Sequence, residues 1–305
     1  MKQVIMGLVL CLLLAGCSGT NNIVPEPSPG ASPAVATPNA SPPPTQTPPP
    51  SSVLEPGTLQ STLGFGDTTG KRILITDGAG KEQQMSKLTL AVGHNGQTLK
   101  VKYLNWQPAS EDNTARETAV NIPNLSGYLY AVEEGAAAPN ETYYMADDSV
   151  FDVEALVSVT PAAKDTEAPA VDEAIGSTIA TAKGREILRI WKLADLGTEG
   201  EVYVTQFVRD GNDMLFSIVL KSGEDYTYMD YPAVIQGDEY SVWRVDDGGE
   251  ITPEMFSVLL AARTEQGILL GLNWWGAEGV STFFLNQDGE QFKELDIQYG
   301  RYISP

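Results

Sequence analysis

Residues 268–289 read ILLGLNWWGAEGVSTFFLNQDG. Apolar, β-branched and aromatic residues dominate Ile268–Trp274 and Val280–Leu285, and short stretches of this kind with period-two alternation are typical of strands. The dipeptide Asp288-Gly289 follows, and such dipeptides tolerate the positive φ angles of tight hairpin turns. This part of the chain therefore predicts two strands followed by a turn.

The same strand pattern recurs in six stretches that precede this one. They are Lys87–Val92, Leu99–Leu104, Gly127–Val132, Glu201–Val208, Met214–Leu220 and Tyr240–Val245. Turn dipeptides stand between several of them, as at Asn95-Gly96 and Asp210-Gly211. We therefore expect antiparallel hairpins that follow one another as a meander.

Two segments favour helices. Thr252-Pro253-Glu254 offers a cap, a proline at the first helical position and an acidic group near the positive end of the helix dipole. Apolar and basic residues follow it at helical spacing, namely Phe256, Leu259, Leu260 and Arg263. The other segment is Val171–Lys183, which places Val171, Ile175 and Ile179 on one face. The fold class expected is therefore α+β and β-rich, with two or three short helices.

A weak internal repeat is visible when the turns are aligned. Ile187–Trp191 precedes Glu201–Val208 and the Asp210-Gly211 turn, much as Ile268–Leu272 precedes Val280–Leu285 and the Asp288-Gly289 turn. A third copy would begin at Ile73. Any meander of hairpins can also produce such coincidences, so a true repeat and a chance alignment both stay open.

The composition excludes several kinds of protein. The chain has 305 residues, 40 acidic against 19 basic side chains, a net charge of −21 and one histidine. One histidine is too few for a multi-histidine metal site, and two cysteines are too few for a disulfide-dense scaffold. Nucleic acid is an unexpected partner, because binding it requires clustered positive charge.

The amino terminus has the features of a secretion signal. Met1-Lys2 is positive and Val4–Leu14 is an apolar run of 11 residues, too short to cross a bilayer, which takes about 20. The residues that follow, Leu14-Ala15-Gly16-Cys17, resemble the lipobox of bacterial lipoproteins. The resemblance implies that residues 1–16 are a signal peptide and that Cys17 carries a diacylglyceryl group and usually a further acyl chain at its amino group. A plain secretory signal with a chance cysteine is the alternative.

The resemblance also implies a location. The protein would be lipid-anchored at the outer, extracytoplasmic face of the cell membrane, and two or three acyl chains give durable attachment. Removal of residues 1–16 takes away Lys2, which leaves 40 acidic and 18 basic residues and a net charge of −22. A Gram-positive surface and an outer membrane both remain open.

Residues 17–57 join the anchor to the remainder of the chain. They contain 12 of the 20 prolines and too few apolar side chains to offset the entropy of folding, so this segment is expected to be a disordered linker. Its reach would be on the order of 100 Å if proline keeps it extended. We expect two β-rich halves beyond it, at residues 58–162 and 170–305, with both helices in the second half. Pro161–Ala170, rich in Ala, Pro and charge, looks like their joint.

Aromatic residues are the best candidates for a binding surface. Trp274 and Trp275 are adjacent on a predicted strand, so they point to opposite faces. Trp243 and Tyr228 add further rings, and exposed Trp and Tyr can stack on the faces of sugar rings. Large aromatics are also common core residues, and this interpretation stays open.

Signatures of catalysis are weak. A histidine-activated nucleophile would depend on His94, which precedes the Asn95-Gly96 turn, and the sequence has no Gly-x-Ser-x-Gly motif. The densest acidic clusters are Asp246–Glu250 and Asp147-Asp148, which fit either acidic turns or a carboxylate pair for glycoside hydrolysis. No catalytic residue, metal ligand or cofactor is assigned, and the prediction leans away from an enzyme.

The leading functional prediction is a non-enzymatic binding or interaction module at the cell surface. Its partners would be the membrane through the lipid anchor, together with a cell-wall glycan or a cationic peptide or protein that the negative charge attracts. One alternative is a carboxylate-dependent hydrolase of extracellular polysaccharide. Another is an accessory scaffold of a membrane assembly, which would show a large exposed apolar patch.

Overall fold

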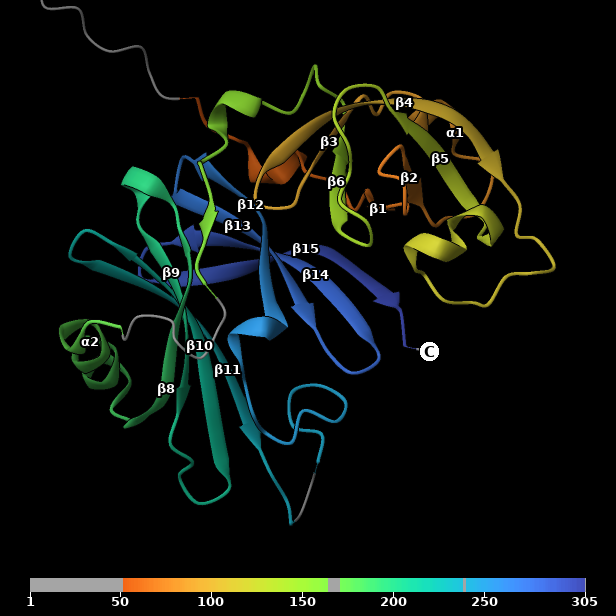
Figure 1. The fold of residues 1–305 in the computed structure, drawn as a ribbon. Helices are drawn as coiled ribbons and strands as arrows, with labels where there is room; N and C mark the ends of the chain where they lie inside the picture. Colours follow the sequence, from red (N-terminus) through yellow and green to blue (C-terminus); the bar gives the residue numbers. More distant parts are fainter. Residues whose placement is uncertain (1–51, 164–170, 238–239, 305) are drawn as a thin grey trace, which may run out of the picture. The chain divides into compact units, whose positions relative to one another are not determined.

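The computed structural model describes residues 52–163, 171–237 and 240–304. These residues belong to one compact unit, which contains a closed six-stranded barrel and a nine-stranded sheet (Figure 1). The predicted signal peptide, Cys17 and the linker up to residue 51 lie outside the described residues. The expectation of a β-rich fold built from antiparallel strands is confirmed, whereas the closure of the first six strands into a barrel was not expected.

The barrel is antiparallel throughout, with the strand order β1-β2-β5-β4-β3-β6. Its strands are β1 (Leu63–Gly66), β2 (Arg72–Ile75), β3 (Leu90–Gly93), β4 (Gln97–Gln107), β5 (Gly127–Val132) and β6 (Thr142–Ala146). Tyrosine rings fill much of the interior, and Tyr130, Tyr128 and Tyr143 are fully buried. The Tyr130 hydroxyl donates to the carbonyl of Met85 at 2.9 Å, which satisfies that polar group inside an apolar core. Met85 ends the short helix α1 (Glu82–Met85).

The nine-stranded sheet consists of two meanders and a short edge strand. Its strands are β7 (Thr160–Pro161), β8 (Ile187–Asp195), β9 (Glu201–Phe207), β10 (Asp213–Ser222), β11 (Asp225–Val234), β12 (Phe256–Thr264), β13 (Gly267–Trp275), β14 (Gly279–Asp288) and β15 (Gln291–Tyr302). The meander β8–β11 and the meander β12–β15 meet where β11 pairs in parallel with β15, at Tyr228 and Gln291. The parallel junction places the last strands of the two meanders side by side.

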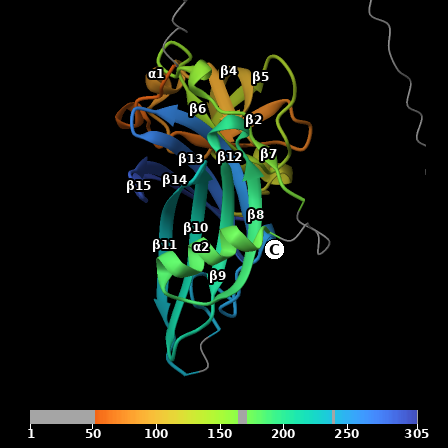
Figure 2. The same cartoon turned by 90° about the vertical axis from the view of Figure 1, so that its left-hand side faces the viewer.

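The sheet bends around one apolar core. Residues of β8–β10 and of β12–β14 contribute to the same buried cluster, in which Phe216, Phe256 and Leu270 are fully buried. The outer face of β9–β11 is covered by α2 (Glu173–Lys183), whose Ile179 is buried among side chains of those strands (Figure 2). The outer face of β12–β15 is covered instead by the barrel, as in the contact between the rings of Phe284 and Tyr144 at 5.6 Å. Each meander is therefore covered, at least in part, on both of its faces.

The predicted helix at 171–183 is confirmed as α2. The Asp172 side chain caps its first turn by accepting from the amide of Ala174 at 2.8 Å. Gly184, with φ of 60°, ends the helix in the left-handed conformation that glycine adopts at low cost. Among the described residues the other helical segments are α1 and five 3₁₀ turns. These turns are η1 (Pro56–Thr58), η2 (Ala119–Asn124), η3 (Val153–Ala155), η4 (Gly197–Glu199) and η5 (Pro253–Met255).

The helix expected after Thr252 is wrong. Pro253 does start a helical turn, but η5 ends at Met255 and strand β12 follows directly. A bulge in β12 between Val258 and Leu260 interrupts the alternation of the strand. Leu259 and Leu260 therefore both pack in the apolar cluster between the sheet and the barrel. The bulge in a strand buried on both faces produces the spacing that resembles a helical face.

The strand expected at Tyr240–Val245 is also wrong. This stretch is a loop without strand pairing, and its backbone amides are bound by the carboxylate of Asp247. The amides of Val242, Trp243 and Arg244 donate to Asp247 at 2.9, 2.7 and 2.8 Å. A side chain, and not a neighbouring strand, satisfies these donors, and this is why the alternating pattern gives no strand here.

Segments of the amino-terminal half cover the edge of β12. The amides of Asn95 and Gly96, in the β3–β4 turn, donate to the carbonyls of Val258 and Leu259 at 3.0 and 2.9 Å. The amide of Leu54 donates to the carbonyl of Arg263 at 2.7 Å, and its side chain is 2% exposed. The last residues of the expected linker are thus packed against the sheet, which protects an edge that could otherwise pair with another chain.

The two better copies of the suspected repeat are equivalent in pairing, because β8 pairs antiparallel with β9 and β13 with β14. The third copy differs, since β2 and β3 are not neighbours in the barrel. Strands β1–β6 and β7–β15 fall on either side of the stretch between Ala146 and Thr160. The repeat itself stays a prediction.

Candidate functional site

A cavity of about 360 Å³ opens at one end of the core enclosed by the large sheet, and we call it the aromatic cavity. Strands β11, β13, β14 and β15 and the loop after β11 contribute to it. Its lining residues are Tyr231, Trp243, Arg244, Trp274, Ser281, Thr282, Phe283, Glu294, Gln298, Tyr299 and Gly300. The volume falls at the lower end of the range common for small-molecule sites, about 300–1,000 Å³.

Packed aromatic rings form the apolar part of the aromatic cavity. The Trp274 ring stacks on Phe256 at 5.3 Å and meets the Tyr231 ring at 5.6 Å. Tyr231 in turn stacks on Phe216, with ring centres 4.6 Å apart and an angle of 7° between planes. The indole of Trp243 meets Phe216 edge-on at 5.1 Å and donates to the carbonyl of Tyr231 at 3.0 Å. These contacts hold the rings in place without a ligand.

Asp247 positions the loop that brings Trp243 and Arg244 to the aromatic cavity. Its carboxylate accepts the amides of Val242, Trp243 and Arg244, and also that of Gly249 at 3.0 Å. The acidic run 246–250 therefore contains a structural acceptor. Asp246, beside it, is exposed and adopts a positive φ of 57°.

Arg244 is the cationic group of the aromatic cavity. Its Nη1 donates to Ser281 Oγ at 2.8 Å and its Nη2 to the carbonyl of Gly279 at 3.2 Å. The guanidinium carbon lies 5.5 Å from the centre of the Trp274 ring. Burial lowers the pKa of Arg244, while the charge of Asp247 acts in the opposite direction. No described carboxylate lies within ion-pair distance of this guanidinium.

Four buried polar atoms of the lining residues have no hydrogen-bond partner within the described part of the chain. They are the Tyr231 hydroxyl, the Tyr299 hydroxyl, Arg244 Nε and Trp274 Nε1. Burial raises the pKa of Tyr231, so its hydroxyl stays protonated and can donate. Each of these groups carries a hydrogen, and buried donors are normally paired because leaving them unpaired costs about 1–3 kcal/mol. Four residues that line the aromatic cavity therefore carry donors that protein atoms do not satisfy.

Glu294 is the single carboxylate among the described lining residues of the aromatic cavity. Its Oε1 accepts from the Gln298 amide at 2.9 Å. Glycoside hydrolysis by the usual route needs two carboxyl groups about 5–9.5 Å apart across the bond. The lining of the aromatic cavity supplies one acid, which can accept hydroxyl donors of a ligand.

The four aromatic residues singled out from the sequence fall in three places. Trp243 and Trp274 come together in the aromatic cavity. Trp275 lies on the opposite face of β13, where its indole nitrogen donates to Ser257 Oγ at 3.4 Å. It lines a neighbouring hollow of about 250 Å³, which Arg244 also lines. Tyr228 packs beneath α2, with Lys183 Nζ 3.9 Å from its ring centre. The alternation of side chains along a strand predicts that Trp274 and Trp275 point to opposite faces. The burial of Tyr228 depends instead on the face of the sheet that α2 covers, which is a tertiary contact.

The sequence patterns assigned no role to Arg244 or Glu294 as site residues. Arg244 directly follows Trp243, and a cation next to a candidate stacking residue is a signal that could have been used. Glu294 is one of 40 acidic side chains, so composition alone does not separate it from surface acids.

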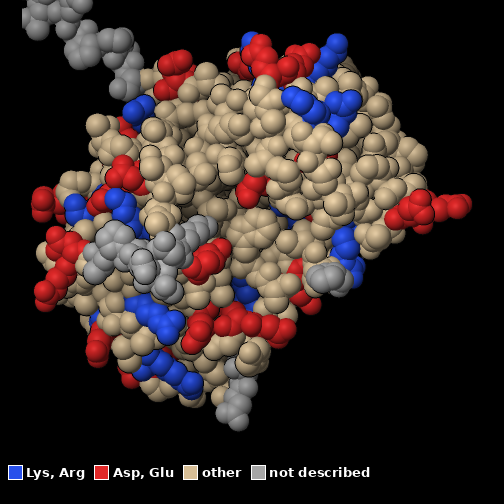
Figure 3. All heavy atoms as spheres, in the orientation of Figure 1, with Lys and Arg blue, Asp and Glu red and all other residues tan. Residues whose placement is uncertain are grey.

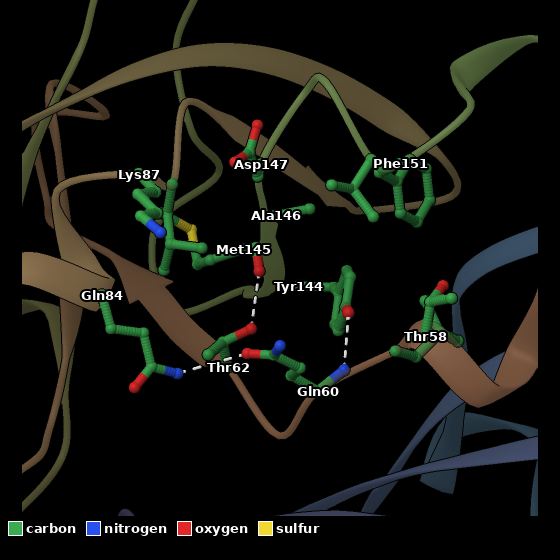
Figure 4. Close-up of a pocket in the computed structure, with 13 residues that line it drawn as sticks. Thr58, Gln60, Thr62, Gln84, Lys87, Tyr144, Met145, Ala146, Asp147 and Phe151 are labelled. Carbon is green, nitrogen blue, oxygen red and sulfur yellow. Dashed lines mark hydrogen bonds between the residues drawn. The ribbon is translucent and has the colours of Figure 1, made fainter.

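A second cavity, of about 280 Å³, lies on the barrel beside β6 and residues 58–62, which precede β1 (Figure 4). The polar groups of this barrel cavity bond to one another. The amide of Gln60 donates to the Tyr144 hydroxyl at 3.0 Å, the Gln84 amide to Gln60 Oε1 at 3.2 Å, and Thr62 Oγ1 to the carbonyl of Met145 at 2.6 Å. None of its described lining residues carries an unpaired buried side-chain polar atom. The barrel cavity is therefore the weaker candidate.

The remaining candidate groups lie at the surface. His94 is exposed in the β3–β4 turn, with φ of 45°. Asp147 accepts from the amide and hydroxyl of Ser149 at 2.9 and 2.6 Å, and these bonds lower its pKa. In the described ranges no three His, Cys, Asp or Glu side chains are grouped to hold a metal ion. The same ranges contain no helix with the length and apolar composition needed to cross a membrane.

Acidic side chains are prominent on the face drawn in Figure 3. The face drawn in Figure 3 has the orientation in which β14 and β15 lie near the centre of Figure 1, and it is hollowed near its middle. Asp and Glu side chains gather below this hollow, in keeping with the excess of acidic over basic residues in the chain. A ligand therefore approaches a predominantly acidic protein.

No known protein family, curated protein or solved structure matches the chain.

Proposed function

We propose that the chain is a lipid-anchored, extracytoplasmic lipoprotein whose folded part is a non-enzymatic module that binds saccharides in the aromatic cavity. Cys17 carries the anchor, residues 18–51 form the spacer, and the domain that begins near Leu54 binds the ligand. The proposal joins the lipobox resemblance at the amino terminus to one structural observation.

That observation is the pairing of aromatic rings with unsatisfied donors in one cavity. Trp243, Trp274 and Tyr231 all line the aromatic cavity, and such rings offer flat apolar surfaces to the C–H faces of sugar rings. Buried N–H and O–H groups there lack protein acceptors, and sugar hydroxyl oxygens would supply them. An apolar cavity with a few convergent polar groups is the usual form of a small-ligand site.

Several features favour binding over hydrolysis. The aromatic cavity has one described carboxylate, Glu294, and its cation Arg244 is hydrogen-bonded in place.

A cationic peptide is the other ligand class that the negative charge of the chain suggests. Two of the unpaired groups, Arg244 Nε and Trp274 Nε1, can only donate hydrogen bonds, and together with the positive charge of Arg244 they match oxygen-rich sugars better than ammonium groups.

The proposal is tested by binding measurements on the full chain, purified in detergent micelles. A panel of cell-wall and plant saccharides and of cationic peptides is titrated into the protein by calorimetry. We expect saccharides of this panel to bind. Trp243→Ala should abolish that binding, whereas Trp275→Ala, which removes an indole from the opposite face of the sheet, should retain it. Release of reducing ends from the bound saccharide, or binding of peptides alone, would contradict the proposal.

The anchor is tested separately in cells. Cys17→Ser should move the protein from the membrane pellet to the medium, because the spacer and domain have no other proposed attachment. An unchanged distribution between pellet and medium would contradict the anchoring part and leave the binding part standing.

A further inference from the structure

We infer that the aromatic cavity selects acidic saccharides, those with a carboxylate on the sugar ring, and that Arg244 is the residue that binds this carboxylate. The inference rests on the proposed saccharide binding and specifies the ligand class for the same cavity. It makes Arg244 a specificity-determining residue.

The first support is the unbalanced charge of Arg244. Its guanidinium is partly buried and bonds to two neutral acceptors, Ser281 Oγ and the carbonyl of Gly279. Asp247 acts on it through its charge, but the Asp247 oxygens are occupied by four backbone amides. A carboxylate on the ligand would meet a cation that has no ion-pair partner in the described residues, and such charge-assisted bonds are stronger than neutral ones.

The second support is the position of Arg244 relative to the rings. Its guanidinium lies 5.5 Å from the centre of Trp274, and Trp243 is its neighbour in the chain. A saccharide that enters the aromatic cavity beside these residues would therefore bring its exocyclic group near the guanidinium. A uronic acid carries its carboxylate on that exocyclic carbon, where a neutral hexose carries a hydroxymethyl group.

The third support is that the backbone around Arg244 is shaped to hold the guanidinium. A Cβ at Gly276 would stand 2.4 Å from Arg244 Nε and 3.1 Å from its central carbon. Glycine at position 276 thus provides the space that the guanidinium occupies. Asp247 restrains the main chain of Arg244 by accepting its backbone amide. Restraints of this kind reduce the ordering cost of binding.

The negative charge of the whole protein opposes the binding of acidic saccharides. The full chain has a net charge of −21 and therefore repels anions over a range of about 10 Å at moderate salt. Without a local cation, the acidic form of a sugar would bind less tightly than its neutral form. A preference for the acidic form therefore requires a group such as Arg244, and the preference itself is the quantity to measure.

The experiment compares trigalacturonate with its methyl ester, which has the same ring and no charge, by calorimetry on the full chain in detergent micelles. We expect the acid to bind about tenfold more tightly than the ester, a difference of about 1.4 kcal/mol. Arg244→Gln should remove this preference while binding of the ester persists. Arg189→Gln makes the same charge change at an exposed position on β8 and should keep the preference.

The outcomes separate the two proposals. Equal binding of acid and ester to the unmodified protein would overturn the inference and leave saccharide binding intact. A preference that survives in Arg244→Gln would also overturn it. If neither compound nor any other saccharide of the panel binds, both proposals fail. Arg244→Lys keeps the positive charge but lacks the planar set of donors of arginine. A preference for the acid in this variant that lies between those of the unmodified protein and Arg244→Gln would show that loss of charge, and not loss of the fold, explains the result.

Discussion

The carboxylate of Asp247 accepts the backbone amide of Arg244 at 2.8 Å, and the same oxygen accepts that of Trp243 at 2.7 Å. One acidic residue thus fixes the backbone of both the cation and one of the rings of the aromatic cavity. Loops generally carry function when a rigid framework positions them, and here a single side chain supplies much of that rigidity.

Replacing Asp247 should therefore loosen the loop and weaken binding. In Asp247→Asn, the amide NH₂ group faces backbone donors that the carboxylate oxygens accept in the native protein. We expect a loss of about 1–3 kcal/mol in the free energy of unfolding and faster amide hydrogen exchange at residues 242–249. Asp246→Asn removes the same charge from the exposed neighbouring residue and serves as the control. Equal exchange rates in both variants would contradict the role given to Asp247.

Gly276→Ala should act on the guanidinium of Arg244 and not on the fold. The added Cβ would lie 2.4 Å from Arg244 Nε, so the side chain must move. We expect the preference for trigalacturonate over its ester to fall toward unity, with a change in stability below about 1 kcal/mol. Gly78→Ala adds a methyl group where nothing lies within 4 Å, and calorimetry should find its preference unchanged. An unaltered preference in Gly276→Ala would show that Arg244 does not need this space.

Arg301 should be essential for joining the barrel to β15. It is 3% exposed, and its guanidinium donates to the carbonyls of Glu117 and Asn140 at 3.1 and 2.5 Å. It also lies 4.7 Å from the ring centre of Phe65 in β1. Arg301→Met leaves these carbonyls without a donor, and we expect it to lower the free energy of unfolding by at least about 2 kcal/mol.

Urea unfolding measures the effect of Arg301→Met. The control is Arg72→Met, also on the barrel side, where the guanidinium donates to the carbonyl of Lys71 at 3.0 Å at the surface. Its effect should stay within about 0.5 kcal/mol. Comparable losses in the two variants would show that the buried contacts of Arg301 carry no special weight.

The Lys192–Glu201 ion pair predicts a pH-dependent contribution to stability. Lys192 Nζ lies 2.5 Å from Glu201 Oε1, and this hydrogen bond, with that from Tyr203, lowers the pKa of Glu201. A carboxyl whose pKa is lower in the folded state stabilises the protein above its unfolded pKa of about 4.3, and loses this contribution as pH falls through the folded value.

The test compares the unmodified protein with Glu201→Gln by urea unfolding from pH 7 to pH 3. The unmodified protein should be more stable by about 0.2–1 kcal/mol at pH 7, a modest value because the pair is partly exposed. The difference should close below about pH 4, since protonated Glu resembles Gln. Asp225→Asn, which removes an exposed acid from a hairpin turn, should show no such closing. A gap that widens toward low pH would reverse the sign and refute the assignment.

Much of the sheet could be predicted because its strands leave a local signature. β9, β10, β13 and β14 coincide with stretches rich in β-branched and aromatic residues, and Asp210-Gly211 and Asp288-Gly289 lie at the turns that follow β9 and β14. Gly211 and Gly289 have φ of 59° and 65°, which is the conformational requirement that made these dipeptides informative. Likewise Val171–Lys183 carries the helical spacing that α2 buries against the sheet.

The errors come from contacts that are distant in the sequence. β12 is buried on one face by the large sheet and on the other by the barrel, so its apolar run has no polar side to reveal a strand. The loop at 240–245 alternates like a strand, but Asp247 satisfies its amides. In both cases a local pattern fits two structures, and long-range packing selects between them.

The local order of residues is enough to identify the β-rich class, the α2 helix, the main turns and the lipobox-like amino terminus, because each depends on neighbours within a few positions. The barrel closure, the β11–β15 junction and the aromatic cavity depend on something else. Tyr231, Arg244, Trp274 and Glu294 are separated by up to 63 positions in the chain and meet because the sheet bends around one core. Burial of both meanders against different covers sets that bend, and no local propensity encodes it.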